Sequence, residues 1–306
     1  MLVRAFGLIV LLLLPAAGLF AMVDAATAHY VALGTLFAFL IGVTSRPIAP
    51  FALLIPFAYA AAGITGSFTD GVAALIVAVA AAAGAASSQG YHRGLFGMLA
   101  AVLMGSFEPA AAELVLARSG AMFAGAAYGL LLVMTVAKQT NAPSLAVHPQ
   151  TALSYAVLLA VLVLVAWLVA RMAGFPHAWW LPLSVATLGE PSLHGSAGKS
   201  VARLASALAA TFLVLVLLDA VEVPAVRAAC AIGLLLAILT LGRSRSWVQG
   251  FLLAPLLLLF AADDPVDPDA SYLHATLLAS VLVFMFTVLG KWMLWTLRPD
   301  AGRVHA

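Results

Sequence analysis

Long apolar runs make up most of the chain, and short polar stretches or stretches with Pro and Gly separate them. Most runs approach the roughly 20 residues that a helix needs to cross the hydrocarbon core of a bilayer. Backbone groups in lipid find no water to bond, so such runs must be helical. The pattern predicts helices at 5–22, 29–43, 47–66, 71–88, 92–107, 119–137, 152–172, 178–189, 200–218, 223–242, 247–262 and 272–296.

The composition agrees with this pattern. Hydrophobic residues account for 65% of the 306 residues and charged residues for 8%, and the mean hydropathy is +1.13. A soluble domain carries roughly 25% charged residues, so the solvent of this chain must be the bilayer. We therefore expect an all-α integral membrane protein with about twelve transmembrane helices.

The charges give an independent check on the number of crossings. If the N-terminus is cytoplasmic, all but three of the 14 Lys and Arg fall on the cytoplasmic side, and the exceptions are Arg118, Arg171 and Arg227. All but two of the 12 Asp and Glu fall on the outer side. This is the positive-inside bias of membrane proteins. It supports twelve crossings with both termini in the cytoplasm.

The two halves of the chain share a weak internal repeat. His29 and His177 each open a helix at a matching position, and Lys138 and Lys291 close the two halves. Six helices per half is an even number, so both halves would have the same orientation in the membrane. We expect one six-helix repeat over 1–150 and a second, parallel one over 151–306.

Small residues indicate where helices approach closely. Gly125 and Gly129 form a GxxxG motif, and the stretch 72–86 is rich in alanine. Both features favour tight helix contacts in lipid.

Residues 174–210 are the most informative segment. The predicted helix 178–189 is a dozen residues long, about 18 Å, which is too short to span. Pro182 interrupts it and Pro191 follows it. Its first-half counterpart, 29–43, is also short. Short, Pro-interrupted segments at matching positions of two halves indicate the substrate site of a transporter.

This segment holds most of the candidate site residues. Glu190 follows the short helix, where an acid at membrane depth is costly and often functional, although it is also compatible with a solvated loop carboxylate. Lys199 and Arg203 share a helix face and can attract an anion, or can simply anchor the cytoplasmic side. We expect residues 190–203 to line a cavity that opens to the cytoplasm, with Glu190 and His194 titrating.

Three further candidates lie elsewhere. His177 and Trp180 are predicted at the opposite membrane interface, beside Trp179. Tryptophans at such an interface usually form an anchoring belt, and the alternative is a platform for substrate. Arg46 follows the first-half helix and completes the set of substrate-binding candidates.

Cofactor and metal motifs are missing from the sequence. GSAGKS at 195–200 resembles the end of a phosphate-binding loop, but Leu193 stands where that loop needs a glycine. The acidic run 263–269 lacks the spacing of a calcium loop. The histidines show no metal-ligand or paired-acid spacing, and Cys230 is a lone cysteine. We expect no cofactor, no metal and no enzymatic activity.

The same segment resembles a known family. HAWWLPL (177–183), EPSLHGS (190–196) and RLASALAA (203–210) are similar to the short aromatic helix, the turn and the small-residue helix of the fusaric acid resistance (FUSC-like) and aromatic acid exporter family. Two glycines of the family pattern are replaced by Ser206 and Ala210. The resemblance implies six-helix units, an inner-membrane location and export of small organic acids.

These observations favour a secondary transporter that exports small aromatic-type organic anions with the proton gradient. A channel-like anion uniporter and a non-transport membrane assembly partner remain alternatives. The expected partners are the organic anion, protons and the lipid bilayer. A homo-oligomer is compatible with the sequence, whereas the small net charge of +2 and the scattered basic residues argue against nucleic acid. The expected location is a bacterial-type inner membrane.

Overall fold

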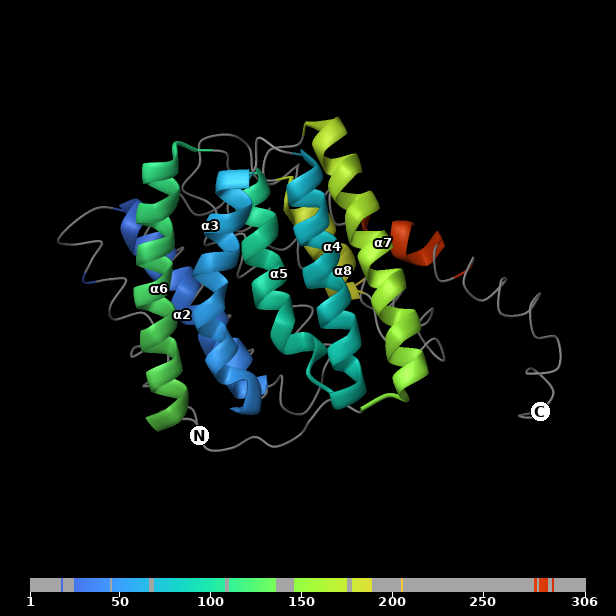
Figure 1. Ribbon diagram of the computed structural model, residues 1–306, viewed down its shortest axis with the longest axis horizontal. Helices are drawn as coiled ribbons and strands as arrows, with labels where there is room; N and C mark the ends of the chain where they lie inside the picture. Colours follow the sequence, from blue (N-terminus) through green and yellow to red (C-terminus); the bar gives the residue numbers. More distant parts are fainter. Residues whose placement is uncertain are drawn as a thin grey trace.

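The computed structural model describes residues 18, 25–44, 46–65, 69–107, 110–135, 146–174, 178–188, 205, 278–279, 281–285 and 288. All regular secondary structure among these residues is helical. With the labels of Figure 1, the elements are α2 (Ala25–Thr44), the 3-10 helix η1 (Arg46–Leu54), α3 (Ile55–Thr65), α4 (Thr69–Ala85), the 3-10 helix η2 (Ala86–Gln89), α5 (His92–Phe107), α6 (Ala112–Thr135), α7 (Pro149–Ala173) and α8 (Trp180–Leu188).

Most predicted helices in the described part of the chain are confirmed. The helix at 92–107 is α5, and the helix at 152–172 is α7. The run 47–66 folds as η1 followed by α3, and Pro50 lies inside η1, where its missing N–H removes an α-helical hydrogen bond. The predicted helices 5–22, 200–218, 223–242 and 247–262 lie outside the described residues, apart from single residues.

Two helices, α2 and α6, begin four or more residues before their predicted starts. α6 starts at Ala112 rather than 119, so Glu113 lies in its first turn, where a negative charge is favourable, and Arg118 lies within the helix. α2 starts at Ala25 rather than 29 and has 20 residues. At about 1.5 Å per residue it is roughly 30 Å long. The prediction of a short helix at 29–43 is therefore wrong.

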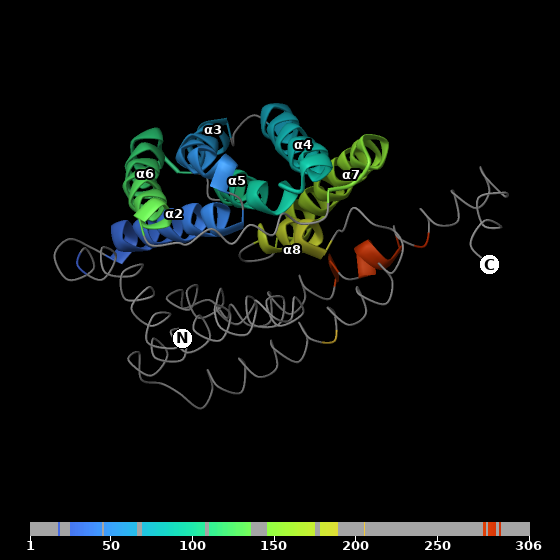
Figure 2. The same cartoon turned by 90° about the horizontal axis from the view of Figure 1, so that it is seen from below.

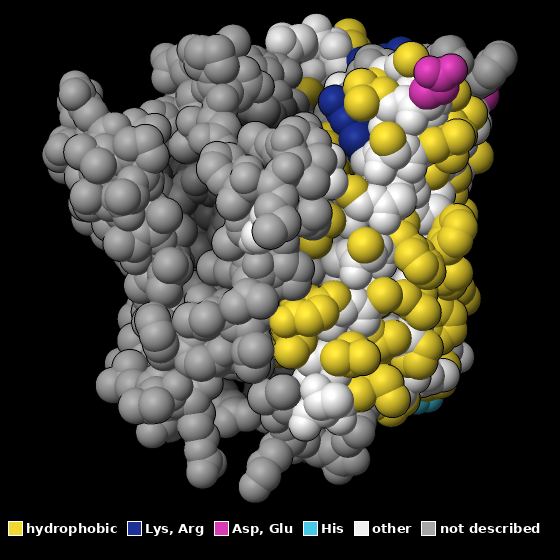
Figure 3. Space-filling view, turned by 90° about the vertical axis from the view of Figure 1, so that its left-hand side faces the viewer, with side chains coloured by type: hydrophobic (Ala, Val, Ile, Leu, Met, Phe, Trp, Pro, Cys, Tyr) yellow, Lys and Arg dark blue, Asp and Glu magenta, His cyan; other side chains and the backbone are white. Residues whose placement is uncertain are grey.

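Four described helical segments are long and apolar enough to cross a membrane: Pro47–Thr65, Asp70–Gln89, Ala112–Thr135 and Pro149–Ala173. Large apolar side chains cover their outer surfaces, among them Leu131 and Met134 of α6 and Leu153 and Val157 of α7. Figure 3 shows such a surface, hydrophobic over most of its described height with charged side chains gathered near one end. Water does not favour so much exposed apolar surface, so this surface fits contact with lipid.

The described helices form two layers. Figure 2 shows α6, α3, α4 and α7 in one row and α2, α5 and α8 in the row behind it. The most extensive contacts join α2 to α6, α4 to α7 and α3 to α5. α5 also contacts α4, α2 and α8, which makes it the centre of the packed core.

Small residues set the two closest helix contacts, as the sequence predicts. A side chain on Gly125 of α6 would overlap the carbonyl oxygen of Val31 on α2, and one on Gly129 would approach the carbonyl oxygen of Thr35 within 2.5 Å. Between α4 and α7, a side chain on Gly84 would overlap the backbone of Ala156. The GxxxG motif and the alanine-rich helix therefore serve close packing.

Successive helices alternate in direction, because the connections between α3, α4, α5 and α6 are short. Asp70 and Glu113, in the first turns of α4 and α6, therefore lie at one end of the bundle. Arg46 and His92, which begin η1 and α5, lie at the other end. This arrangement agrees with the predicted separation of charge. The proposed relation between 1–150 and 151–306 involves helices outside the described residues and stays a prediction.

Candidate substrate site at the junction of α7 and α8

The structure describes two of the seven candidate residues. Glu190, His194, Lys199, Arg203 and His177 lie outside the described residues, so the predicted cavity of 190–203 stays a prediction. Only the backbone of Arg46 is described, at the start of η1. Trp180 is the first residue of α8. It is buried at the junction of α7 and α8, within a group of aromatic side chains.

Local sequence determines where α7 ends. Gly174 follows its last residue with φ 62°, a left-handed conformation that a glycine adopts without steric cost. Arg171 lies in the last turn, where a positive charge faces the negative end of the helix dipole. Residues 178–179 form a turn that leads directly into α8.

Pro182 does not interrupt the short helix, contrary to the sequence-based prediction. It is the third residue of α8, within the first turn, where a backbone N–H has no partner inside the helix. The neighbouring N–H of Leu183 still reaches the carbonyl oxygen of Trp179 at 3.3 Å. Pro182 therefore helps to start α8 rather than break it.

Trp179 and Trp180 stack on one another inside the protein. Their ring centroids are 4.0 Å apart with an interplanar angle of 21°, and the two residues are 8% and 4% exposed. Tryptophans of an anchoring belt lie against lipid headgroups, so burial rules out the belt interpretation for this pair. The indole Nε1 of Trp179 is buried and has no hydrogen-bond partner in the described part of the chain.

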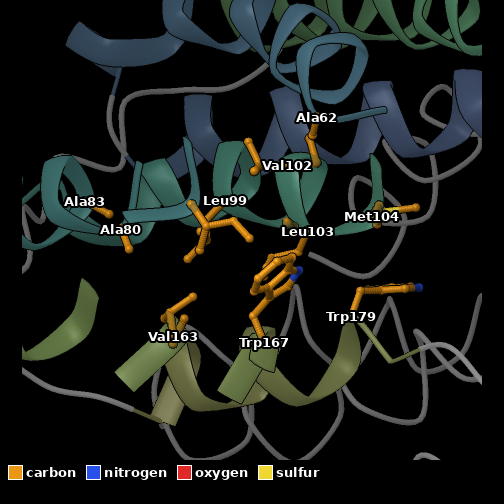
Figure 4. Close-up of a cluster of buried hydrophobic side chains, with 14 of the residues drawn as sticks. Ala62, Ala80, Ala83, Leu99, Val102, Leu103, Met104, Val163, Trp167 and Trp179 are labelled. Carbon is orange, nitrogen blue, oxygen red and sulfur yellow. The ribbon is translucent and has the colours of Figure 1, made fainter. Parts of the chain in front are cut away.

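Trp167 of α7 forms the second part of the aromatic group. Its Nε1–H donates to Ser106 Oγ of α5 at 3.2 Å, and its ring lies 6.3 Å from the ring of Phe107. The guanidinium carbon of Arg171 lies 5.4 Å from the centre of the same ring, a cation–π contact. Figure 4 shows Trp167 and Trp179 on the same side of α5, beside Leu103 and Met104.

A second arginine lies over an aromatic ring in the first half of the chain. Arg118 of α6 is 5.2 Å from the ring centre of Tyr30 on α2, and the hydroxyls of Tyr30 and Tyr59 are 3.4 Å apart. The neighbouring Ser119 Oγ donates to the carbonyl oxygen of Pro56 at 2.7 Å. Sequence reasoning missed Arg118 and Arg171 as site candidates. The sequence did set both arginines apart, because both are exceptions to the positive-inside pattern.

The α7–α8 junction brings several groups of different chemistry together. It combines planar aromatic rings, an indole N–H and a guanidinium, which are suited to stacking and to holding an anion. Among the residues that the structure describes, no group of three or more His, Cys, Asp or Glu is arranged to hold a metal ion.

Comparison with known proteins finds a family that is similar to this region. Residues 165–286 match the family model described as fusaric acid resistance protein-like, and the match contains Trp167, Arg171, Trp179 and Trp180. No curated protein and no solved structure matches the chain. The family points to transport or efflux across a membrane rather than to enzymatic activity. Over 165–286 this multi-pass helical membrane protein is thus similar to the fusaric acid resistance protein-like family, and the resemblance predicted from 174–210 is confirmed.

Proposed function

We propose that the protein is a secondary transporter that exports small organic anions of aromatic type and is driven by the proton gradient. The observation that carries the proposal is the group of Trp167, Trp179 and Trp180 with Arg171, inside the family-matched segment. Aromatic faces favour a planar ring, and a guanidinium attracts a carboxylate and pairs with it. An organic acid with an aromatic ring offers both partners.

The proposed coupling uses the segment that follows α8. Lys199 and Arg203 attract the anion from the cytoplasm, and Glu190 with His194 exchanges the coupling proton. His177, Trp180 and Arg46 complete the path. The sequence offers no nucleotide-binding loop, so an ion gradient is the energy source that this chain can use.

The proposal includes the complete architecture. Twelve helices form two parallel six-helix repeats, both termini are cytoplasmic, and the membrane is a bacterial-type inner membrane. The described helices support the first half of this arrangement, because each of them overlaps a predicted span and the acidic first turns of α4 and α6 lie at one end.

Substitutions in the coupling segment test the proposal. We expect Glu190→Gln to flatten the pH dependence of transport, because the amide cannot titrate, and Arg203→Ala to weaken anion uptake about tenfold, the effect of one lost charged contact. Transport of a panel of aromatic and aliphatic acids is measured in proteoliposomes across about pH 5 to 8, where histidine and perturbed carboxyl groups titrate. Lys138→Ala is the control, a cytoplasmic base outside the segment. If both variants transport at wild-type rates, residues 190–203 form a structural turn and take no part in transport.

A further inference from the structure

The indole N–H of Trp179 is a buried donor that finds no acceptor among the residues that the structure describes. Trp179 is 8% exposed, and no described residue accepts a hydrogen bond from its Nε1. Buried tryptophan N–H groups usually find a partner, because leaving one unpaired costs free energy. Trp167, at the same junction, shows the usual arrangement, since its N–H donates to Ser106 Oγ at 3.2 Å. An orphaned donor in a native protein needs an explanation.

Stacking restricts how a ligand can reach Trp179. The centroid separation of 4.0 Å to Trp180 leaves no room for a third ring between the two indoles. A ligand therefore meets Trp179 at its outer face or at the edge that carries the N–H. In Figure 4 the nitrogen of Trp179 points away from Trp167 and Leu103. The donor is thus directed away from these two core side chains.

We propose that the Trp179 Nε1–H donates a hydrogen bond to a carboxylate oxygen of the transported aromatic acid and so selects substrates that carry this acceptor. The identity of the ligand rests on the proposed function. Arg171, eight residues earlier on the last turn of α7, supplies positive charge at the same junction. A bond to a charged acceptor is stronger than one between neutral groups, so the unpaired donor is satisfied only in the loaded protein.

Indole NMR signals of the full chain in detergent micelles provide the first test. The protein is labelled with ¹⁵N at its 6 tryptophans and titrated with benzoate as the probe. The Trp179 indole proton, assigned from the spectrum of Trp179→Phe, should move downfield and saturate as the hydrogen bond forms. The Trp167 signal should stay, because its acceptor is Ser106. An unmoved Trp179 signal at saturating benzoate overturns the proposal.

Thermal stability provides the second test, with Trp167→Phe as the matched control. Both variants keep an aromatic ring and remove an indole N–H. Without benzoate, Trp167→Phe should lower the melting temperature more than Trp179→Phe does, because both variants lose buried indole area but only Trp167→Phe loses a hydrogen bond. Benzoate should raise the melting temperature of the wild type, and the Trp179→Phe protein should need about tenfold more benzoate for the same rise. An equal response of Trp179→Phe and wild type contradicts the proposal.

The two proposals fail separately. Transport of aromatic acids with an unmoved Trp179 signal leaves the proposed function standing and removes Trp179 from the substrate site. A saturable Trp179 shift without transport supports the binding site and contradicts the transporter.

Discussion

At the scale of single residues, the absence of a side chain determines how closely α2 and α6 approach. Val31 faces Gly125, and Thr35 faces Gly129 four residues further along both helices. The two helices therefore run in the same direction with their backbones in contact. Lipid offers no hydrophobic driving force between helices, so this close van der Waals packing is what holds them together.

A single added methyl group tests this contact. We expect Gly125→Ala to lower the stability of the protein by roughly 1–3 kcal/mol, the usual cost of overpacking, because the new Cβ overlaps the carbonyl group of Val31 and helix backbone cannot move aside cheaply. The melting temperature in detergent is the measurement.

Gly120→Ala is the matched control for this prediction. Gly120 lies on the same helix, and nothing lies within 4 Å of the position of its Cβ. Alanine is a better helix former than glycine, so this variant should be as stable as the wild type or more stable. Equal destabilisation by both substitutions would show that the α2–α6 contact is not tight.

At the scale of elements, the pattern of apolar runs predicts where the described helices lie but not every helix start. α5 has the predicted bounds, because a mostly apolar run begins after His92 and ends at Phe107. The predicted helix began at 119, seven residues after the observed start of α6, for a physical reason. The second turn of α6 contains Arg118, and a charged residue beside an apolar run indicates a loop rather than a membrane helix. The ring of Tyr30 lies 5.2 Å from that guanidinium and helps to hold it in the helix.

The site was less predictable than the helices. The sequence marked Trp180 as a candidate, but interfacial Trp normally indicates an anchoring belt, and no local pattern states that Trp179 and Trp180 are buried and stacked. Stacking occurs where α8 contacts α5 and α7, which is a tertiary feature. Ser106 is a partner of Trp167 from another helix, so only the fold reveals it.

The direction of each helix gives a prediction at this scale. With Cys230 replaced by serine, single cysteines are introduced at Asp70, Arg93 and Lys138 and treated with a membrane-impermeant maleimide. We expect labelling from outside at 70 only, because α4 and α5 begin at opposite ends of the bundle and the positive-inside bias predicts that the start of α5 is cytoplasmic. Permeabilised cells, in which all three positions should react, are the control. Strong labelling from outside at position 138 would show that the predicted topology is wrong.

At the scale of the whole molecule, the described residues place different chemistry in two regions of the bundle. In the described first half, tight glycine contacts join α2 to α6, and an arginine lies over a tyrosine near one end. The family-matched region begins within α7 and contains the tryptophan group with its unpaired donor. Two of the three exceptions to the positive-inside pattern, Arg118 and Arg171, are the arginines that lie over aromatic rings. Both arginines that the predicted topology leaves on the outer side, as far as the structure describes them, thus lie over aromatic rings.

The direction in which benzoate accumulates across a pH gradient tests the central claim most directly. Purified protein is reconstituted into liposomes whose membrane potential is clamped with potassium and valinomycin, and labelled benzoate is followed. Diffusion of the neutral acid through lipid concentrates benzoate on the alkaline side, as protein-free liposomes will show. A transporter that exchanges the anion for protons concentrates it on the acidic side. We predict protein-dependent accumulation on the acidic side that is reduced in Trp179→Phe, whereas the same distribution as in protein-free liposomes would contradict the account.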